Sequence, residues 1–94
     1  MADSSMSNIG AVETYGKNLA NVNQQMIQIF QKIRQQTDSL RTSWNDDQFD
    51  RFRQDFDQDI MKKIREISVK MEMFSKYVEE MCKIHRMAQQ SKYY

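Results

Sequence analysis

After residue 16 the chain contains neither proline nor glycine, so nothing in the rest of its 94 residues obliges a helix to break. Gly10 and Gly16 are its two glycines, and it has no proline. The remaining composition favours helices, because methionine, glutamine, lysine, arginine and glutamate are all plentiful. No segment shows the alternation of β-branched and polar residues that is typical of a strand. We therefore predict an all-α fold in one domain spanning residues 1–94.

Residues 42–49 separate two long segments with helical periodicity. This stretch holds Trp44, the chain's one tryptophan, followed at once by Asn45 and Asp46. Asparagine and aspartate cap helix N-termini well, because their side chains accept hydrogen bonds from backbone N–H groups that the helix leaves free. Both residue types also favour turns. We predict that this segment is the bend of an antiparallel two-helix hairpin, with Trp44 at its tip.

The limits of the two helices follow from this bend. We expect the first helix over about residues 9–42, the turn at 43–45 and the second helix over about 46–88. The two ends of the chain, residues 1–8 and 89–94, are short and mostly polar. We expect both of them to fray.

Apolar residues on both predicted helices recur at steps of three and four, the pattern by which helices pack side by side. From Phe52 to Ile64 every step is four residues, a stutter that locally relaxes a left-handed supercoil. The predicted core of the hairpin consists of Leu19, Val22, Met26, Ile29, Ile33 and Leu40 from the first helix and Phe49, Phe56, Ile60, Ile64, Ile67, Met71 and Phe74 from the second.

Further apolar residues lie off these two stripes and form a candidate dimer face. One hairpin covers one stripe per helix, so a second set of large apolar residues suggests a second contact surface. A single hairpin of this length also buries little core. We therefore expect an elongated four-helix bundle, either a homodimer or a heterodimer with a related hairpin. The residues of the candidate dimer face are Ile27, Phe30, Met61, Val69 and Met73.

Charge is spread unevenly along a chain whose formal net charge is only +1. Residues 45–59 hold six aspartates and two arginines, whereas residues 60–94 hold eight basic residues and four glutamates. Acids near the start of a long helix and bases toward its end complement the helix dipole, although the same pattern would also suit a binding patch. The near-neutral total argues against a nucleic-acid partner.

Neither a membrane span nor a cleavable leader is expected. No apolar run approaches the ~20 residues that a transmembrane helix needs. The start of the chain lacks the apolar segment of a signal peptide. The protein is therefore expected in the cytoplasm or in a secretion route that needs no such peptide.

Three groups of residues are candidates for chemistry. Cys82 and His85 lie on one helical face and could both contact a metal, but two ligands are half a site, and a lone cysteine is more often a small buried hydrophobe. Three phenylalanines near the bend could form an aromatic ligand box, although such spacing is usual for core. No nucleophile is placed beside a base, and a two-helix hairpin offers little concavity for a substrate. We expect no enzyme, no cofactor and no metal site.

The bend resembles that of the WXG-type family, the small early-secreted-antigen-like helical hairpins of type VII secretion. Trp44, Asn45 and Asp46 stand where this family has Trp-x-Gly, and Phe52 follows the tryptophan by eight residues, where the family has a large apolar residue. Asp46 replaces the family glycine. The family's export motif, Tyr-x-x-x-Asp/Glu, is absent, because Tyr77 is followed four residues later by a methionine.

This resemblance implies a non-enzymatic protein that works through protein–protein contacts. It would be a substrate, co-secreted partner or adaptor of a type VII-like system, secreted without a cleavable signal peptide and in contact with the secretion machinery. The alternative is a cytoplasmic helical scaffold or assembly chaperone unrelated to secretion. Trp44, Asn45, Asp46 and Phe52 form the candidate turn and recognition motif, in which Trp44 is either a recognition surface or a plug for the end of the bundle.

Overall fold

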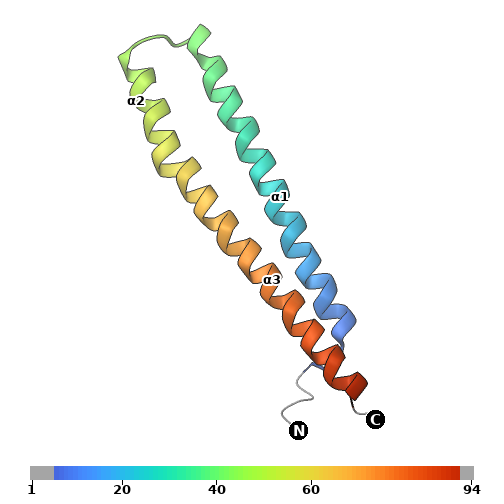
Figure 1. The fold of residues 1–94 in the computed structure, drawn as a ribbon. Helices are drawn as coiled ribbons and strands as arrows, with labels where there is room; N and C mark the ends of the chain where they lie inside the picture. The colour runs from blue at the N-terminus through green and yellow to red at the C-terminus, as the bar shows by residue number, and fades with distance from the viewer. Residues whose placement is uncertain (1–5, 92–94) are drawn as a thin grey trace.

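The computed structural model describes residues 6–91, which form an antiparallel hairpin of two long helical arms (Figure 1). No strand occurs in these residues, so the predicted all-α hairpin is confirmed. The molecule is a rod of 71 × 16 × 16 Å. The first arm consists of α1 (Ile9–Ser39) and a short 3-10 turn, η2 (Leu40–Thr42), and the second consists of α2 (Asp47–Phe56), η3 (Asp57–Met61) and α3 (Lys62–Ser91).

These limits lie close to the expected ones. The first arm ends at Thr42, as expected, and the second begins at Asp47, one residue later than expected. Helix α3 continues through Ser91, into a segment that we expected to fray. Residues 1–5 and 92–94, the outer parts of the two expected tails, lie outside the described residues.

Two side chains start the helices as caps. The side chain of Asn8 accepts a hydrogen bond from the backbone N–H of Ala11 at 3.0 Å, and the side chain of Asp46 accepts one from Phe49 N at 3.0 Å. Between the arms, the backbone N–H groups of Ser43 and Trp44 both donate to the carbonyl oxygen of Leu40. No residue in the described part of the chain has a positive φ. The turn therefore requires no glycine at position 46.

The two arms meet along a seam in which every seventh residue faces the other helix. Most of its buried members are small or polar, including Asn23, Thr37 and Ser68, which are 5–9% exposed, although Ile9 is buried as well. Phe49 and Cys82 are the largest fully buried side chains of the described residues. The seam consists of Ile9, Gly16, Asn23, Phe30 and Thr37 on α1 and Met61, Ser68, Ser75 and Cys82 on the second arm.

Small residues in the seam let the helices approach closely. A Cβ added at Gly16 would lie 3.0 Å from Val78 Cγ1. The hydroxyl of Ser75 donates to the carbonyl oxygen of Gly16 at 2.9 Å, and the Asn23 side-chain amide donates to the carbonyl oxygen of Ser68 at 3.1 Å. The seam is therefore narrow and partly polar at the levels of Gly16 and Asn23.

Several residues of the predicted core lie outside this seam. Phe49 is fully buried, but Val22, Ile29 and Phe74 are 52%, 56% and 64% exposed. The difference arises because the small residues, not the large apolar ones, take the closest positions between the helices. The other exposed members are Leu40, Ile60 and Ile67, and the half-buried ones are Leu19, Met26, Ile33, Phe56, Ile64 and Met71.

The residues of the candidate dimer face also differ in their exposure. Val69 and Met73 are exposed, whereas Ile27, Phe30 and Met61 are half-buried. Phe30 and Met61 belong to the seam itself. Ile27, Met61 and Val69 nevertheless line one hollow between the arms, whereas Met73 lies two positions before a seam residue, on the outer side of α3.

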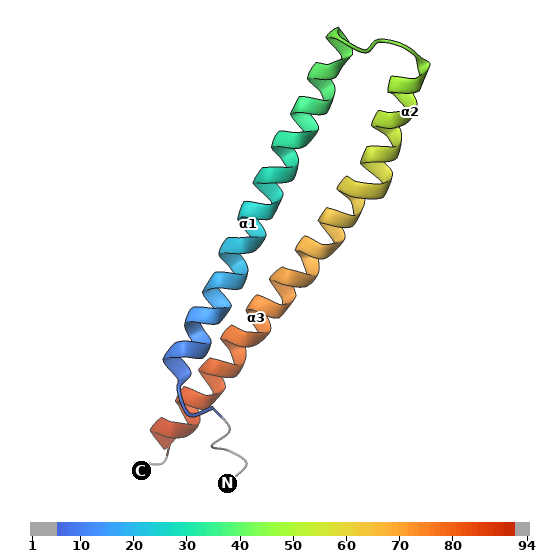
Figure 2. The same cartoon turned by 180° about the vertical axis from the view of Figure 1, so that it is seen from behind.

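The stutter of the second arm coincides with a π-helical segment, η3 (Asp57–Met61). A π turn holds more residues than an α turn, so it keeps apolar residues spaced by four from drifting around the helix axis. The second arm passes through this segment without a break and stays beside the first (Figure 2). Between η3 and the tip, side chains still join the arms, since Arg53 Nε lies 2.8 Å from Asp38 Oδ1.

Candidate functional site

An aromatic cluster closes the tip of the hairpin. The Trp44 ring packs edge-to-face against Phe49, with 5.5 Å between ring centroids, and lies 5.7 Å from Phe52 in a tilted arrangement. The guanidinium carbon of Arg41 lies 5.0 Å from the centroid of the Phe49 ring. Phe52 is 42% exposed and continues toward Phe56 at 6.4 Å. Phe49 is thus the buried anchor of the cluster, while Trp44 and Phe52 reach its surface.

Asp46 holds this cluster in place through one oxygen atom. Its Oδ1 accepts hydrogen bonds from the indole Nε1–H of Trp44 at 2.9 Å and from the backbone N–H of Phe49 at 3.0 Å. The same carboxylate therefore caps α2 and orients the tryptophan. Trp44 is half-buried, and Asn45, which makes no contact of this kind, is exposed. The helix cap was expected from the sequence, whereas the bond to the indole was not.

Ion pairs mark one long side of the hairpin as polar. Glu13 and Arg86 each follow a seam residue by four positions, and the Arg86 guanidinium donates to both Glu13 carboxylate oxygens, at 2.7 and 2.8 Å. Nearer the tip, Arg34 binds Asp57 at 2.9 Å. The Glu13–Arg86 pair places the positions four residues after the seam, on both arms, on one side of the hairpin.

Six large apolar residues lie on the opposite long side. Each directly precedes a seam residue, so it stands about 140° around its helix from the charged positions on the other side. Because the antiparallel helices share the polar side, they also share this apolar one. The six residues are 39–64% exposed. This apolar face consists of Tyr15, Val22 and Ile29 of α1, Ile60 of η3, and Ile67 and Phe74 of α3.

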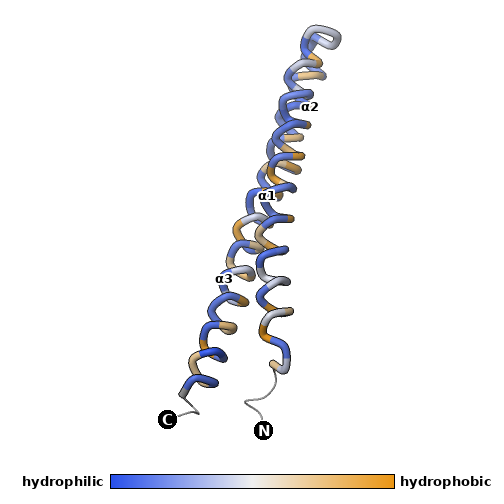
Figure 3. The backbone as a smooth tube through the Cα atoms, turned by 90° about the vertical axis from the view of Figure 1, so that its right-hand side faces the viewer, coloured by the Kyte–Doolittle hydropathy of each residue, from blue (hydrophilic) through white to orange (hydrophobic). Residues whose placement is uncertain are grey.

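The edge-on view shows how such residues are distributed. Apolar segments recur along both arms and alternate with hydrophilic ones (Figure 3). The apolar face itself spans residues 15–29 of the first arm and 60–74 of the second, which is about 21 Å along the helix axis in a rod 71 Å long. The spacing is visible in the sequence, but it does not reveal which of the neighbouring stripes the seam covers.

The ion pairs lower the pKa values of two carboxyl groups. Hydrogen bonds from Arg86 lower the pKa of the Glu13 carboxyl below its ordinary value. A hydrogen bond from Arg34 lowers the pKa of Asp38 in the same way, and Arg53 Nε lies 2.8 Å from the same carboxylate. These carboxylates stay charged under all mildly acidic conditions, so they act as fixed links between the arms.

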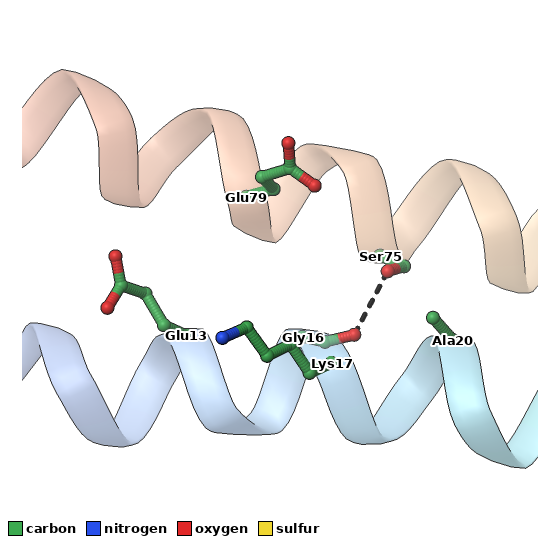
Figure 4. A pocket seen from close by; sticks show the side chains of 6 residues that line it. All are labelled: Glu13, Gly16, Lys17, Ala20, Ser75 and Glu79. Atoms are coloured by element: carbon green, nitrogen blue, oxygen red, sulfur yellow. Dashed lines mark hydrogen bonds between the residues drawn. The ribbon is translucent and has the colours of Figure 1, made fainter.

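One shallow pocket lies between α1 and α3 near the open end of the hairpin, where side chains from both helices surround Gly16 (Figure 4). Ser75 supplies the one hydroxyl among the residues that line it, and this hydroxyl is bonded to the Gly16 carbonyl oxygen. The lining residues are Glu13, Gly16, Lys17, Ala20, Ser75 and Glu79.

The other candidates from the sequence lie apart from these surfaces. Cys82 is 1% exposed, with its Sγ 4.0 Å from the Met6 sulfur, and His85 is half-buried one turn away. Among the described residues, no group of three or more histidines, cysteines or acids could hold a metal ion. No helix of this part of the chain is long and apolar enough to cross a membrane.

Searches of protein-family models, curated proteins and solved structures found no match to this chain.

Proposed function

We propose that the protein is a non-enzymatic hairpin that acts through protein–protein contacts, as a substrate, co-secreted partner or adaptor of a type VII-like secretion system. The observation that carries the contact role is the apolar face, which stays open in the single hairpin. Six large apolar side chains in one row, each 39–64% exposed, favour a partner over a solvated surface. No catalysis and no cofactor enter this proposal.

The partner on this face is a second hairpin, and the product is an elongated four-helix bundle. A hairpin is long and narrow, so a second one can cover the row along its full length. The second hairpin is another copy of this chain or a related chain. The apolar face replaces the residue set chosen from the sequence, because Ile27, Phe30 and Met61 are already half-buried beside the seam.

The contact is tested by charging the middle of the apolar face. We expect Ile29→Asp to abolish dimers seen by sedimentation, because association would then bury an unpaired charge. Gln25→Asp introduces the same charge on the outward side of α1, two positions after the seam residue Asn23, and serves as the matched control. Equal masses for wild type and Ile29→Asp at high concentration, with both folded by circular dichroism, would refute a contact through this face.

The tip is the second surface of the proposal, and its recognition role is a hypothesis that rests on the resemblance to WXG-type proteins. Trp44 and Phe52 form a partly exposed aromatic pair held by Asp46, and such rigid aromatics are enriched among binding hot spots. We expect Trp44→Ala to lose export while its dimer and helicity persist. Phe30→Ala, an aromatic removed from the middle of the hairpin, is the control for stability. Normal export of a folded Trp44→Ala would leave Trp44 as a plug.

A cytoplasmic scaffold is the second candidate, and one observation favours it. Met81 occupies the position four residues after Tyr77, where the export motif of WXG-type proteins has an acid. Detection of the protein in culture medium, lost when the secretion ATPase is deleted, would support the secretion role. Retention in the cytoplasm with an intact ATPase would support the scaffold.

A further inference from the structure

Helix α3 carries a second stripe on the side that faces away from α1. Its five residues follow one another at steps of three, four, three and four, as residues of a helix–helix contact do. Each lies two positions before or after a seam residue, so it points about 160° away from the seam. We call this set the outer stripe, and it consists of Lys70, Met73, Tyr77, Glu80 and Ile84.

The outer stripe is open and apolar at its centre. Met73 and Tyr77 are each 64% exposed, and Ile84 is 49% exposed. A shallow hollow on α3 is lined by Lys70, Met73, Phe74 and Tyr77, so the stripe has a depression that another side chain can fill. A hairpin on the apolar face spans both arms and leaves this outer side of α3 uncovered.

The charges of the outer stripe are arranged symmetrically around its apolar centre. Lys70 lies three residues before Met73, and Glu80 lies three residues after Tyr77. Along the helix, these four residues read base, apolar, apolar, acid. Residue 75 lies midway between Lys70 and Glu80 and also midway between Met73 and Tyr77. If two copies of α3 pack antiparallel about a twofold axis at residue 75, each residue faces a residue of the other copy, and the two residue numbers add up to 150.

We propose that the outer stripe binds the outer stripe of a second copy of this chain, in antiparallel orientation about that twofold axis. Lys70 then faces Glu80 of the second copy, and Met73 faces its Tyr77. Symmetry repeats both pairs, so each contact forms twice. This inference goes beyond the proposed function, because it adds an association through a different side of the hairpin.

Other arrangements of the same two stripes match less well. In a parallel pair, Lys70 would face Lys70 and Glu80 would face Glu80, and like charges repel. If one helix of the antiparallel pair slides by seven residues along the other, Glu80 faces Tyr77 of the second copy, or Lys70 faces its Met73, depending on the direction. Within residues 70–80, only the arrangement centred on residue 75 pairs charge with charge and apolar with apolar, whereas beyond this segment it sets Ile84 against Glu66.

Nearby charges are compatible with this contact. Glu80 already has Lys83 of its own helix nearby, but at 3.9 Å, the outer limit of an ion pair, and both side chains are 62% exposed. Lys76, close to the axis, pairs with Glu72 on its own helix at 3.0 Å, which reduces its repulsion of a second Lys76. The matched segment covers only residues 70–80, so we expect weaker binding than on the apolar face.

Charge reversal tests the proposal. The Ile29→Asp background disables the apolar face, so any remaining dimer reports on the outer stripe. In this background we expect Lys70→Glu or Glu80→Lys to raise the dimer dissociation constant by about tenfold or more, because two attractive pairs become repulsive. The double variant K70E/E80K restores opposite charges and should recover the dimer. The control is Lys32→Glu on α1, which should have no effect.

The outcomes separate this proposal from the proposed function. If sedimentation up to about 1 mM shows the same mass for the Ile29→Asp parent and its three outer-stripe variants, or if the double variant does not recover the dimer, the inference is overturned. Failure of Ile29→Asp to change the mass of the wild-type chain would instead count against the apolar-face dimer. The two results come from different variants and can be read independently.

Cross-linking tests the register directly. In a Cys82→Ser background, Met73→Cys and Tyr77→Cys chains are mixed and oxidised, and we expect a disulfide between the two variants. A mixture of Glu66→Cys with Tyr77→Cys is the control, since its positions are displaced by about 10 Å along the pair. Equal cross-linking in the two mixtures, or none in the first, would refute the antiparallel register.

Discussion

At the scale of single residues, Asp46 explains how this bend works without glycine. One carboxylate oxygen accepts from the backbone of Phe49 and from the indole of Trp44, so the cap of α2 and the position of the tryptophan depend on the same atom. A glycine at this position would supply neither bond. The turn also contains no positive φ, so glycine's conformational freedom is not needed here.

We predict that Asp46→Ala lowers the free energy of unfolding by about 1 kcal/mol, because the first turn of α2 loses its side-chain acceptor. Trp44 fluorescence should shift as well, because the indole loses its partner. Asp46→Asn keeps an acceptor at the same position and should stay near wild type. Chemical denaturation checks both, and equal losses for the two variants would show that the negative charge, not the acceptor, is what matters.

At the scale of the helices, the seam depends on small residues. Gly16 lies against Val78 of α3, and Ser75 binds the Gly16 carbonyl, so the two helices approach each other closely at this level. A larger residue would push the arms apart near their open ends. The helices therefore pack by close backbone contact here, while their large apolar residues turn toward the apolar face.

We predict that the two glycines respond differently to alanine. In open helix positions this change raises stability by about 0.5 to 1 kcal/mol. Gly10→Ala should show a gain, because the new Cβ meets only the Asn8 side-chain oxygen at 3.5 Å. Gly16→Ala should show none, because its Cβ would lie 3.0 Å from Val78 Cγ1. Val78→Ala combined with Gly16→Ala should recover part of the gain, and a full gain in Gly16→Ala alone would contradict the close approach.

At the scale of the whole molecule, the hairpin is a thin rod fastened by ion pairs along its polar side. Glu13 and Arg86 join the arms near their open end, and Arg34 joins α1 to Asp57 nearer the tip. The described core contains few large buried side chains, so the ion pairs, each worth little by itself, add to a packing contact that is small. Acid should weaken the links without affecting the apolar contacts.

We predict that stability falls when the pH drops below about 4. The pKa values of Glu13 and Asp38 are lower in the folded chain than in the unfolded one, so the unfolded state takes up protons first. Their contribution is complete above the ordinary carboxyl pKa and is lost as the pH falls through the lowered values. Thermal melts from pH 7 to pH 2 should show a smaller acid loss for Arg86→Gln than for wild type. Lys76→Gln, which breaks a pair within one helix, is the control, and identical acid profiles for Arg86→Gln and wild type would contradict the prediction.

The sequence by itself determined the helices and the bend. Their signals are local: the absence of helix breakers after Gly16, the periodic apolar residues, and the capping residues beside Trp44. The stutter was also visible as repeated steps of four, and the π-helical segment coincides with it. A seven-residue recurrence of small or polar residues, Gly16 and Asn23 on α1 and Ser68 and Ser75 on α3, is also visible in the sequence.

Only the tertiary structure decided which stripe of each helix faces the other arm. Several apolar stripes lie side by side on each helix, and their spacing alone does not rank them. Close packing selects one stripe, because Gly16, Ser68 and Ser75 let the two helix backbones approach each other, whereas Val22 or Ile67 would hold them apart. As a result, residues predicted as core became an open apolar face. The bond from Trp44 to Asp46 likewise appeared only with the turn's three-dimensional geometry, because the two side chains must fold toward each other to form it.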